Sequence, residues 1–128
     1  MKLWHQALIR DLPDKELLEQ HRTCCVLKRW WGRPERAHTS YVFNYTPAYL
    51  SAYHYFIMQE LKRREFKTDP LYEDPAYRGS NIVIPGWSFN HFILYYHLIN
   101  RCWNYEYIYP EHNDIYLKEC LDALEQRR

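Results

Sequence analysis

The chain has 128 residues, of which 47% are hydrophobic, 26% charged and 18% aromatic, and its formal net charge is +1. This length predicts a single domain that buries enough surface to fold without a metal ion or a disulfide. The near-neutral charge gives no overall sign of a nucleic-acid partner, the three glycines disfavour a glycine-rich phosphate loop, and no apolar run is long enough to cross a membrane.

Apolar residues recur at helical spacing in four stretches. We expect helices over residues 14–30, 46–65, 89–103 and 113–126. Pro13 suits the start of the first helix, with Asp11 or Asp14 as its cap, and Ser88 suits the cap of the third. The connecting loops include 41–43 and 82–84, which are too short for a sheet and are expected to be extended.

The spacing also predicts which residues face the core. These are Leu17, Leu18, His21, Cys24 and Cys25 in the first helix, Leu50, Tyr53, Ile57 and Leu61 in the second, Phe89, Phe92, Ile93, Tyr96, Ile99 and Trp103 in the third, and Leu117, Cys120, Leu121 and Leu124 in the fourth. The predicted fold class is therefore all-α, a compact bundle of about four helices with long ordered loops, forming one domain over 1–128.

Charge is distributed unevenly along the chain. Residues 22–38 carry a net charge of +4, and residues 105–128 carry −3. Such polarity is compatible with one face that binds DNA. The commoner explanation of a charge run is a solvated surface.

Four cysteines without a signal peptide predict reduced thiols in a cytoplasmic protein. His21 and Cys24 or Cys25 have the helical spacing of a two-ligand metal pair, but no paired Cys-x-x-Cys motif accompanies them. We expect these residues to lie in the core, and we expect no metal and no cofactor.

The start of the chain carries a more specific pattern. It reads Met1-Lys-Leu-Trp-His5, then Leu12-Pro-Asp-Lys-Glu-Leu-Leu18, then Gln20-His-Arg-Thr-Cys-Cys25. This layout resembles the pyrimidine-dimer DNA glycosylases of the endonuclease V type, which have a linked abasic-site lyase activity. Arg78-Gly79 and residues 107–112 are weaker similarities, and residues 80–105 look divergent or inserted.

The resemblance implies catalysis by the N-terminal amine, which forms a Schiff base with the sugar of the damaged nucleotide. An α-amine has a pKa of about 8, so much more of it is neutral at pH 7 than of a lysine amine. Here the amine would belong to Met1, because Lys2 is too bulky to allow removal of the initiator methionine. Thr23 stands where the family has its catalytic glutamate.

A threonine cannot stabilise a cationic sugar by charge, and the loss of such a group costs roughly 3–4 kcal/mol of barrier. Glu19, one helical turn before Thr23, is the carboxylate that could replace it. The residues expected to contact DNA are Lys2, His21, Arg22, Lys28, Arg29, Trp30, Arg33 and Arg78. For Trp30, packing at the end of the helix is an equally good explanation.

Three functions remain open at this point. In the first, the chain is a repair-type enzyme that acts on damaged or distorted duplex DNA. It would remove the base as a glycosylase, which is a hydrolase, and then cut the strand as a lyase. Alternatively, it is a non-catalytic descendant that binds DNA or a protein through the same cleft. The third possibility is an unrelated helical interaction domain. The sequence does not decide the lesion or the oligomeric state.

Overall fold

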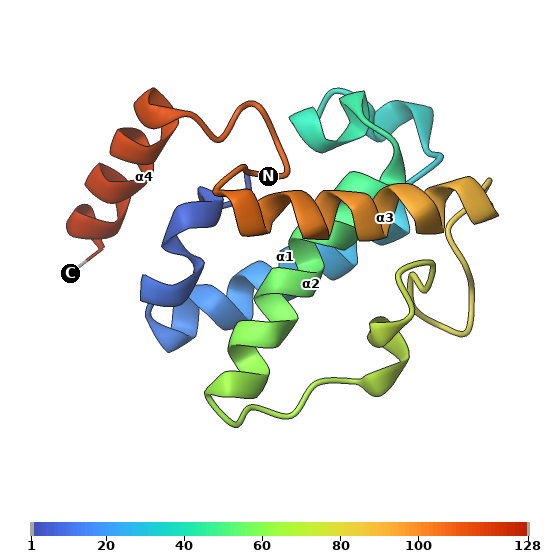
Figure 1. Ribbon diagram of the computed structural model, residues 1–128, viewed down its shortest axis with the longest axis horizontal. Coiled ribbons are helices and arrows are strands. Elements are labelled where there is room, and N and C mark those ends of the chain that lie inside the picture. Colours follow the sequence, from blue (N-terminus) through green and yellow to red (C-terminus); the bar gives the residue numbers. More distant parts are fainter. Residues whose placement is uncertain (1, 128) are drawn as a thin grey trace.

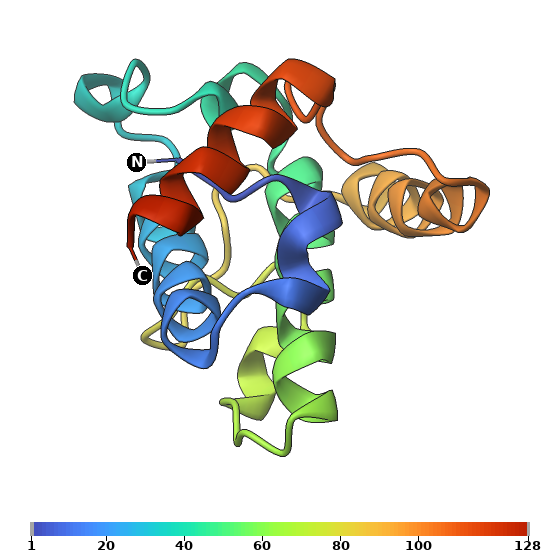
Figure 2. The same cartoon turned by 90° about the vertical axis from the view of Figure 1, so that its left-hand side faces the viewer.

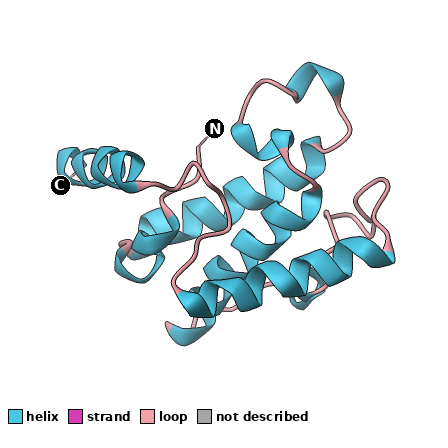
Figure 3. Ribbon diagram, turned by 45° about the horizontal axis from the view of Figure 1, so that its top comes forward, coloured by secondary structure: helices cyan, strands magenta, loops and turns pink. Residues whose placement is uncertain are grey.

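The computed structural model describes residues 2–127, and its regular structure is helical (Figure 1). The α-helices are α1 (Asp14–Trp30), α2 (Pro47–Arg63), α3 (Phe89–Arg101) and α4 (Asp114–Gln126). Between residues 2 and 127 no strand is drawn (Figure 3), and the only β pairing is an isolated bridge between Tyr77 and Val83. The prediction of an all-α fold is confirmed. Within the same residues, no helix has both the length and the apolar character needed to span a membrane.

Short 3-10 helices occupy several of the connections. They are η1 (Gln6–Asp11), η2 (Pro34–Arg36), η3 (Tyr41–Asn44), η4 (Pro70–Glu73) and η5 (Cys102–Asn104). The expectation that residues 41–43 are extended is wrong, because the Ser40 hydroxyl accepts a hydrogen bond from the Val42 backbone N–H and starts a helical turn that buries Val42.

The predicted caps are correct for α3 and wrong for α1. Ser88 and His91 form a reciprocal capping box at the start of α3. At α1 the N-cap residue is Pro13, which has no capping side chain, and neither Asp11 nor Asp14 takes that role. Asp14 instead accepts a hydrogen bond from the Arg64 guanidinium at 2.9 Å, which ties the start of α1 to the end of α2.

The core is centred on α2, which packs against α1 on one side and is crossed by α3 on the other (Figure 1). The predicted inward face of α2 is confirmed. On α1 it is confirmed for Leu17, Cys24 and Cys25, whereas Leu18 and His21 are only half-buried. Leu17 and the four predicted α2 residues, Leu50, Tyr53, Ile57 and Leu61, have no exposed surface. Full burial of each such side chain contributes about 1.5–3 kcal/mol.

The predicted inward face of α3 is largely wrong. Of the predicted residues Ile99 packs inward, but Phe89 and Trp103 are 76% and 79% exposed, and Tyr95 and Leu98, which were not predicted, are buried. Apolar and aromatic residues surround α3, so their spacing alone does not identify the narrow face that meets α2. In α4, Leu121 is likewise exposed, while Cys120 is buried.

The segment before α1 is part of the core. Leu3 and His5 are buried, and the segment runs between α1, α2 and α4 (Figure 2). The Tyr53 hydroxyl of α2 donates to the Trp4 carbonyl at 2.7 Å, and the Tyr116 hydroxyl of α4 donates to the Leu3 carbonyl. These bonds fix the position of Lys2 and the residues that follow it.

Candidate functional site

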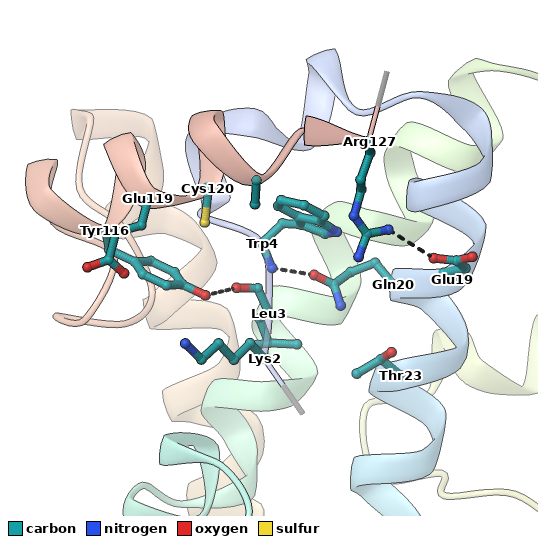
Figure 4. A pocket seen from close by; sticks show the side chains of 11 residues that line it. Lys2, Leu3, Trp4, Glu19, Gln20, Thr23, Tyr116, Glu119, Cys120 and Arg127 are labelled. Atoms are coloured by element: carbon teal, nitrogen blue, oxygen red, sulfur yellow. Dashed lines mark hydrogen bonds and ion pairs between the residues drawn. The ribbon is translucent and has the colours of Figure 1, made fainter. Parts of the chain in front are cut away.

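A pocket of about 340 Å³ opens beside the first described residues (Figure 4). One wall is the segment at the start of the chain, a second is α1, and a third is α4. Its lining residues are Lys2, Leu3, Trp4, Glu19, Gln20, Thr23, Tyr116, Glu119, Cys120, Ala123 and Arg127. The pocket therefore joins both ends of the described chain to the middle of α1.

The α1 wall positions the N-terminal segment through Gln20. This side chain is 2% exposed, and its amide oxygen accepts a hydrogen bond from the Trp4 backbone N–H and lies 3.1 Å from the Tyr53 hydroxyl. Glu19 and Thr23 lie four residues apart on α1, so they share one side of the helix. Both line the pocket, as the sequence predicts for residues of one site.

The α4 wall contributes groups that sequence reasoning did not identify. Arg127 lies 3.7 Å from a Glu19 carboxylate oxygen, and its guanidinium sits over the Trp4 ring at 5.2 Å. Glu119 brings a second carboxylate to the same pocket. The sequence does not predict these residues in the site, because α4 is about a hundred positions from the segment it covers. The acidic character of the last helix is the one weak indication of them.

A buried histidine pair anchors the far end of the N-terminal segment. His112 Nδ1 accepts a hydrogen bond from the Gln6 backbone N–H at 3.0 Å, and its Nε2 lies 2.5 Å from the Tyr41 hydroxyl. The His5 ring stacks on His112 with centroids 5.2 Å apart. Burial lowers the pKa of His112 to about 3 and also lowers the pKa of His5, so both rings are neutral at physiological pH.

The model of one protein family, described as pyrimidine dimer DNA glycosylase, matches residues 1–74. This match covers more than half of the chain and contains the N-terminal segment, α1 and α2. The chain belongs to the pyrimidine dimer DNA glycosylase family. No curated protein and no solved structure matches it. Membership places it among DNA repair glycosylases, whose substrate is DNA, and confirms the resemblance found at the start of the sequence.

The region matched by the family model includes only part of the pocket. Glu19, Gln20 and Thr23 lie inside it, whereas the α4 wall lies outside. The segments noted as weaker similarities, Arg78-Gly79 and residues 107–112, also lie outside. Met1, the predicted nucleophile, is outside the described residues.

The structure contradicts the prediction that Lys28 is a surface contact for DNA. It is 1% exposed, because it lies one turn after Cys24 and Cys25 on the inner face of α1. Burial lowers the pKa of its amine to about 8. Of the basic residues predicted to contact DNA phosphates, Arg22, Arg29 and Arg33 are exposed and remain candidates. Lys28 is no longer one.

Arg78 and Trp30 have internal partners. Arg78 donates to the backbone carbonyls of Trp31 and Arg29, at 3.2 and 3.1 Å, so it binds the free carbonyls at the end of α1. Trp30 is half-buried and has the Arg36 guanidinium 4.3 Å from its ring centroid. Both residues shape the α1 end, and neither needs DNA to explain its position.

Proposed function

We propose that this chain acts on damaged or abasic DNA by Schiff-base chemistry from its N-terminal amine, as a glycosylase with lyase activity. The observation that carries the proposal is the pocket itself. It gathers Lys2, which adjoins the amine, with Thr23, at the position of the family's carboxylate, and with Glu19. The reaction needs an amine and a carboxylate near each other; Lys2 is the described neighbour of the amine, and Glu19 supplies a carboxylate.

The chemistry requires a neutral amine and a nearby base. Attack of the amine on C1′ of the sugar displaces the base and, after ring opening, gives an imine. Loss of a proton from C2′ then expels the 3′ phosphate and cuts the strand. An α-amine suits the first step because of its pKa of about 8. A carboxylate suits the second, since it accepts the proton and stabilises the cationic intermediate.

We assign the carboxylate role to Glu19. It is one helical turn from Thr23, about 6 Å along the axis, and faces the same pocket. Its ion pair with Arg127 is half exposed on both sides, so it is worth about 0–1 kcal/mol and opens at little cost when DNA enters. Because of the displacement, we expect slower chemistry than with a glutamate at position 23, by about 10²–10³-fold.

The test is borohydride trapping on duplex DNA with an abasic site or a pyrimidine dimer, after mass spectrometry has verified a free native N-terminus. The protein should form a covalent adduct at its N-terminal residue, Thr23→Glu should form it faster, and Glu19→Gln should not form it. Glu119→Gln tests the other carboxylate of the pocket, and Asp122→Asn is the matched control on α4, outside the pocket lining. Full trapping by Glu19→Gln would exclude the assignment to Glu19.

A non-catalytic DNA-binding role is the second candidate, and Thr23 is the observation that favours it. In that case no variant with the native Thr23 forms an adduct, yet the protein binds distorted duplex DNA with an affinity that falls steeply with salt. An adduct from Thr23→Glu alone would indicate a scaffold that has lost its acid. The absence of any DNA affinity at low salt would contradict both candidates.

A further inference from the structure

A second cluster of reactive side chains lies outside the pocket, between α1 and α2. His21 and Cys25 are four residues apart on α1, and His54 faces them from α2. His21 Nδ1 lies 2.7 Å from His54 Nε2, and the Cys25 sulfur lies 4.0 Å from His21 Nε2. One ligand atom from each of the three residues falls within 4.8 Å of the others.

The three residues are incompletely satisfied as a hydrogen-bonded group. His54 is fully buried, and its Nδ1 has no hydrogen-bond partner among residues 2–127. Nε2 of this ring is hydrogen-bonded to His21. Nδ1 therefore lacks a partner whether it carries the proton, as an unused donor, or not, as an unused acceptor. Buried polar groups are almost always paired, so an unsatisfied group in such a cluster calls for an unseen partner such as a water or an ion.

We propose that His21, Cys25 and His54 bind a zinc ion that clamps α1 to α2. Two imidazole nitrogens and one thiolate are a donor set that Zn²⁺ takes in proteins, at about 2.0–2.3 Å from each atom. Zinc would replace the 2.7 Å contact between His21 and His54, because two nitrogens bound to one tetrahedral zinc lie about 3.3 Å apart, and the ligand atoms, all within 4.8 Å of one another, are close enough for small side-chain shifts to bring them to the ion. This site is independent of the proposed function, because it lies across α1 from Thr23 and the pocket.

The surroundings supply a path for the ion and an aromatic ring that packs on both histidines. His54 and Tyr72 line a cavity of about 280 Å³ that leads to the surface, from which a water can complete a tetrahedral site. The Tyr72 ring packs edge-on against the His21 and His54 rings, with centroids 6.0 and 5.7 Å away. In metal sites such an apolar shell limits the access of solvent to the ligands.

One neighbour opposes the ion. Lys28 is buried on the same face of α1, and its positive charge acts on both His21 and His54. Removing this charge without removing volume should therefore tighten binding. A Lys28→Met variant should bind Zn²⁺ more tightly than the unsubstituted protein. A cluster with a purely structural role gives no reason for such a gain in zinc affinity.

The first experiment strips the full-length protein with a chelator and titrates it with Zn²⁺ against a chromophoric competitor. We expect one equivalent per chain, and a Co²⁺ form with a thiolate-to-cobalt charge-transfer band in the near ultraviolet. Cys25→Ser should lose that band and weaken binding by at least about 100-fold. The matched control is Cys24→Ser, which changes the adjacent buried thiol outside the cluster.

Circular dichroism establishes that each variant is folded. If Cys25→Ser does not fold, the spectrum of the unsubstituted Co²⁺ protein and the gain in affinity of Lys28→Met decide the matter. The proposal is overturned if the unsubstituted protein holds no stoichiometric Zn²⁺, if its Co²⁺ form lacks the thiolate band, or if Cys24→Ser weakens binding as much as Cys25→Ser. Neither set of results bears on adduct formation at the N-terminus.

Discussion

His112 should make the protein acid-labile at a predictable pH. In the folded state Nδ1 accepts the Gln6 N–H and the pKa is about 3, whereas an exposed histidine has a pKa near 6.5. Between these values the unfolded chain binds a proton that the folded chain does not. The free energy of unfolding therefore falls as the pH decreases below about 6.5, and this contribution stops changing below about 3.

The magnitude follows from the two pKa values. When the pH falls from about 7.5 to about 4.5, the stability changes only over the two pH units below 6.5. At about 1.4 kcal/mol per unit, this one group lowers the free energy of unfolding by about 3 kcal/mol. Other groups add their own pH dependence, including His54, whose pKa burial lowers strongly, and Glu60, whose pKa falls through its bonds to Arg63 and Arg64. A comparison between two proteins isolates the effect of His112.

His112→Asn is the suitable variant, because the asparagine amide oxygen accepts the Gln6 N–H and does not titrate. We expect it to be less stable than the unsubstituted protein by about 1–3 kcal/mol at pH 7.5, through the lost contact with Tyr41 and lost ring packing. At pH 4.5 that difference should shrink by about 3 kcal/mol and vanish or reverse. Urea unfolding followed by tryptophan fluorescence measures both. A difference that stays constant to within about 0.5 kcal/mol would refute the reasoning.

Three further predictions concern single contacts. Arg78→Ala should lower stability by about 1–3 kcal/mol, because it leaves two carbonyls at the end of α1 without their donor, and thermal unfolding with Arg78→Lys as comparison would measure this. Tyr53→Phe should cost about 1–2 kcal/mol and speed amide exchange in residues 3–6, since the hydroxyl that holds the Trp4 carbonyl is lost; unchanged exchange would argue against that anchor. Arg22→Gln should reduce the salt slope of DNA binding by about one, and an unchanged slope would exclude a phosphate contact there.

The parts of the fold that sequence predicted well are those with a one-sided apolar pattern. The bounds expected for α1 agree with the structure at both ends, and its inward leucines and cysteines recur on one face. In α3 the pattern surrounds the helix, so it could not tell Tyr95, which packs inward, from Phe89, which does not. Tertiary contact with α2 made that choice, and no local signal carries it.

The candidate site divides in the same way. Glu19 and Thr23 could be placed together from the helical repeat, because four residues along α1 return to one side. Glu119 and Arg127 could not, since they reach the pocket only through the packing of α4 on the N-terminal segment. Lys28 was predicted wrongly for another reason. Its charge suggested a surface residue, but it lies on the same side of α1 as Cys24 and Cys25 and is buried with them.

The Tyr116–Leu3 hydrogen bond also sets the order in which the protein can be completed during synthesis. It joins residues 113 positions apart, and Arg127 approaches Glu19 from still further along the chain. Segments made first usually fold first on the ribosome. Here the earliest residues to emerge cannot reach their final setting until α4 has been released. The pocket is therefore among the last parts of the molecule to form, and an unfinished chain has no third wall around the residues that we propose as reactive.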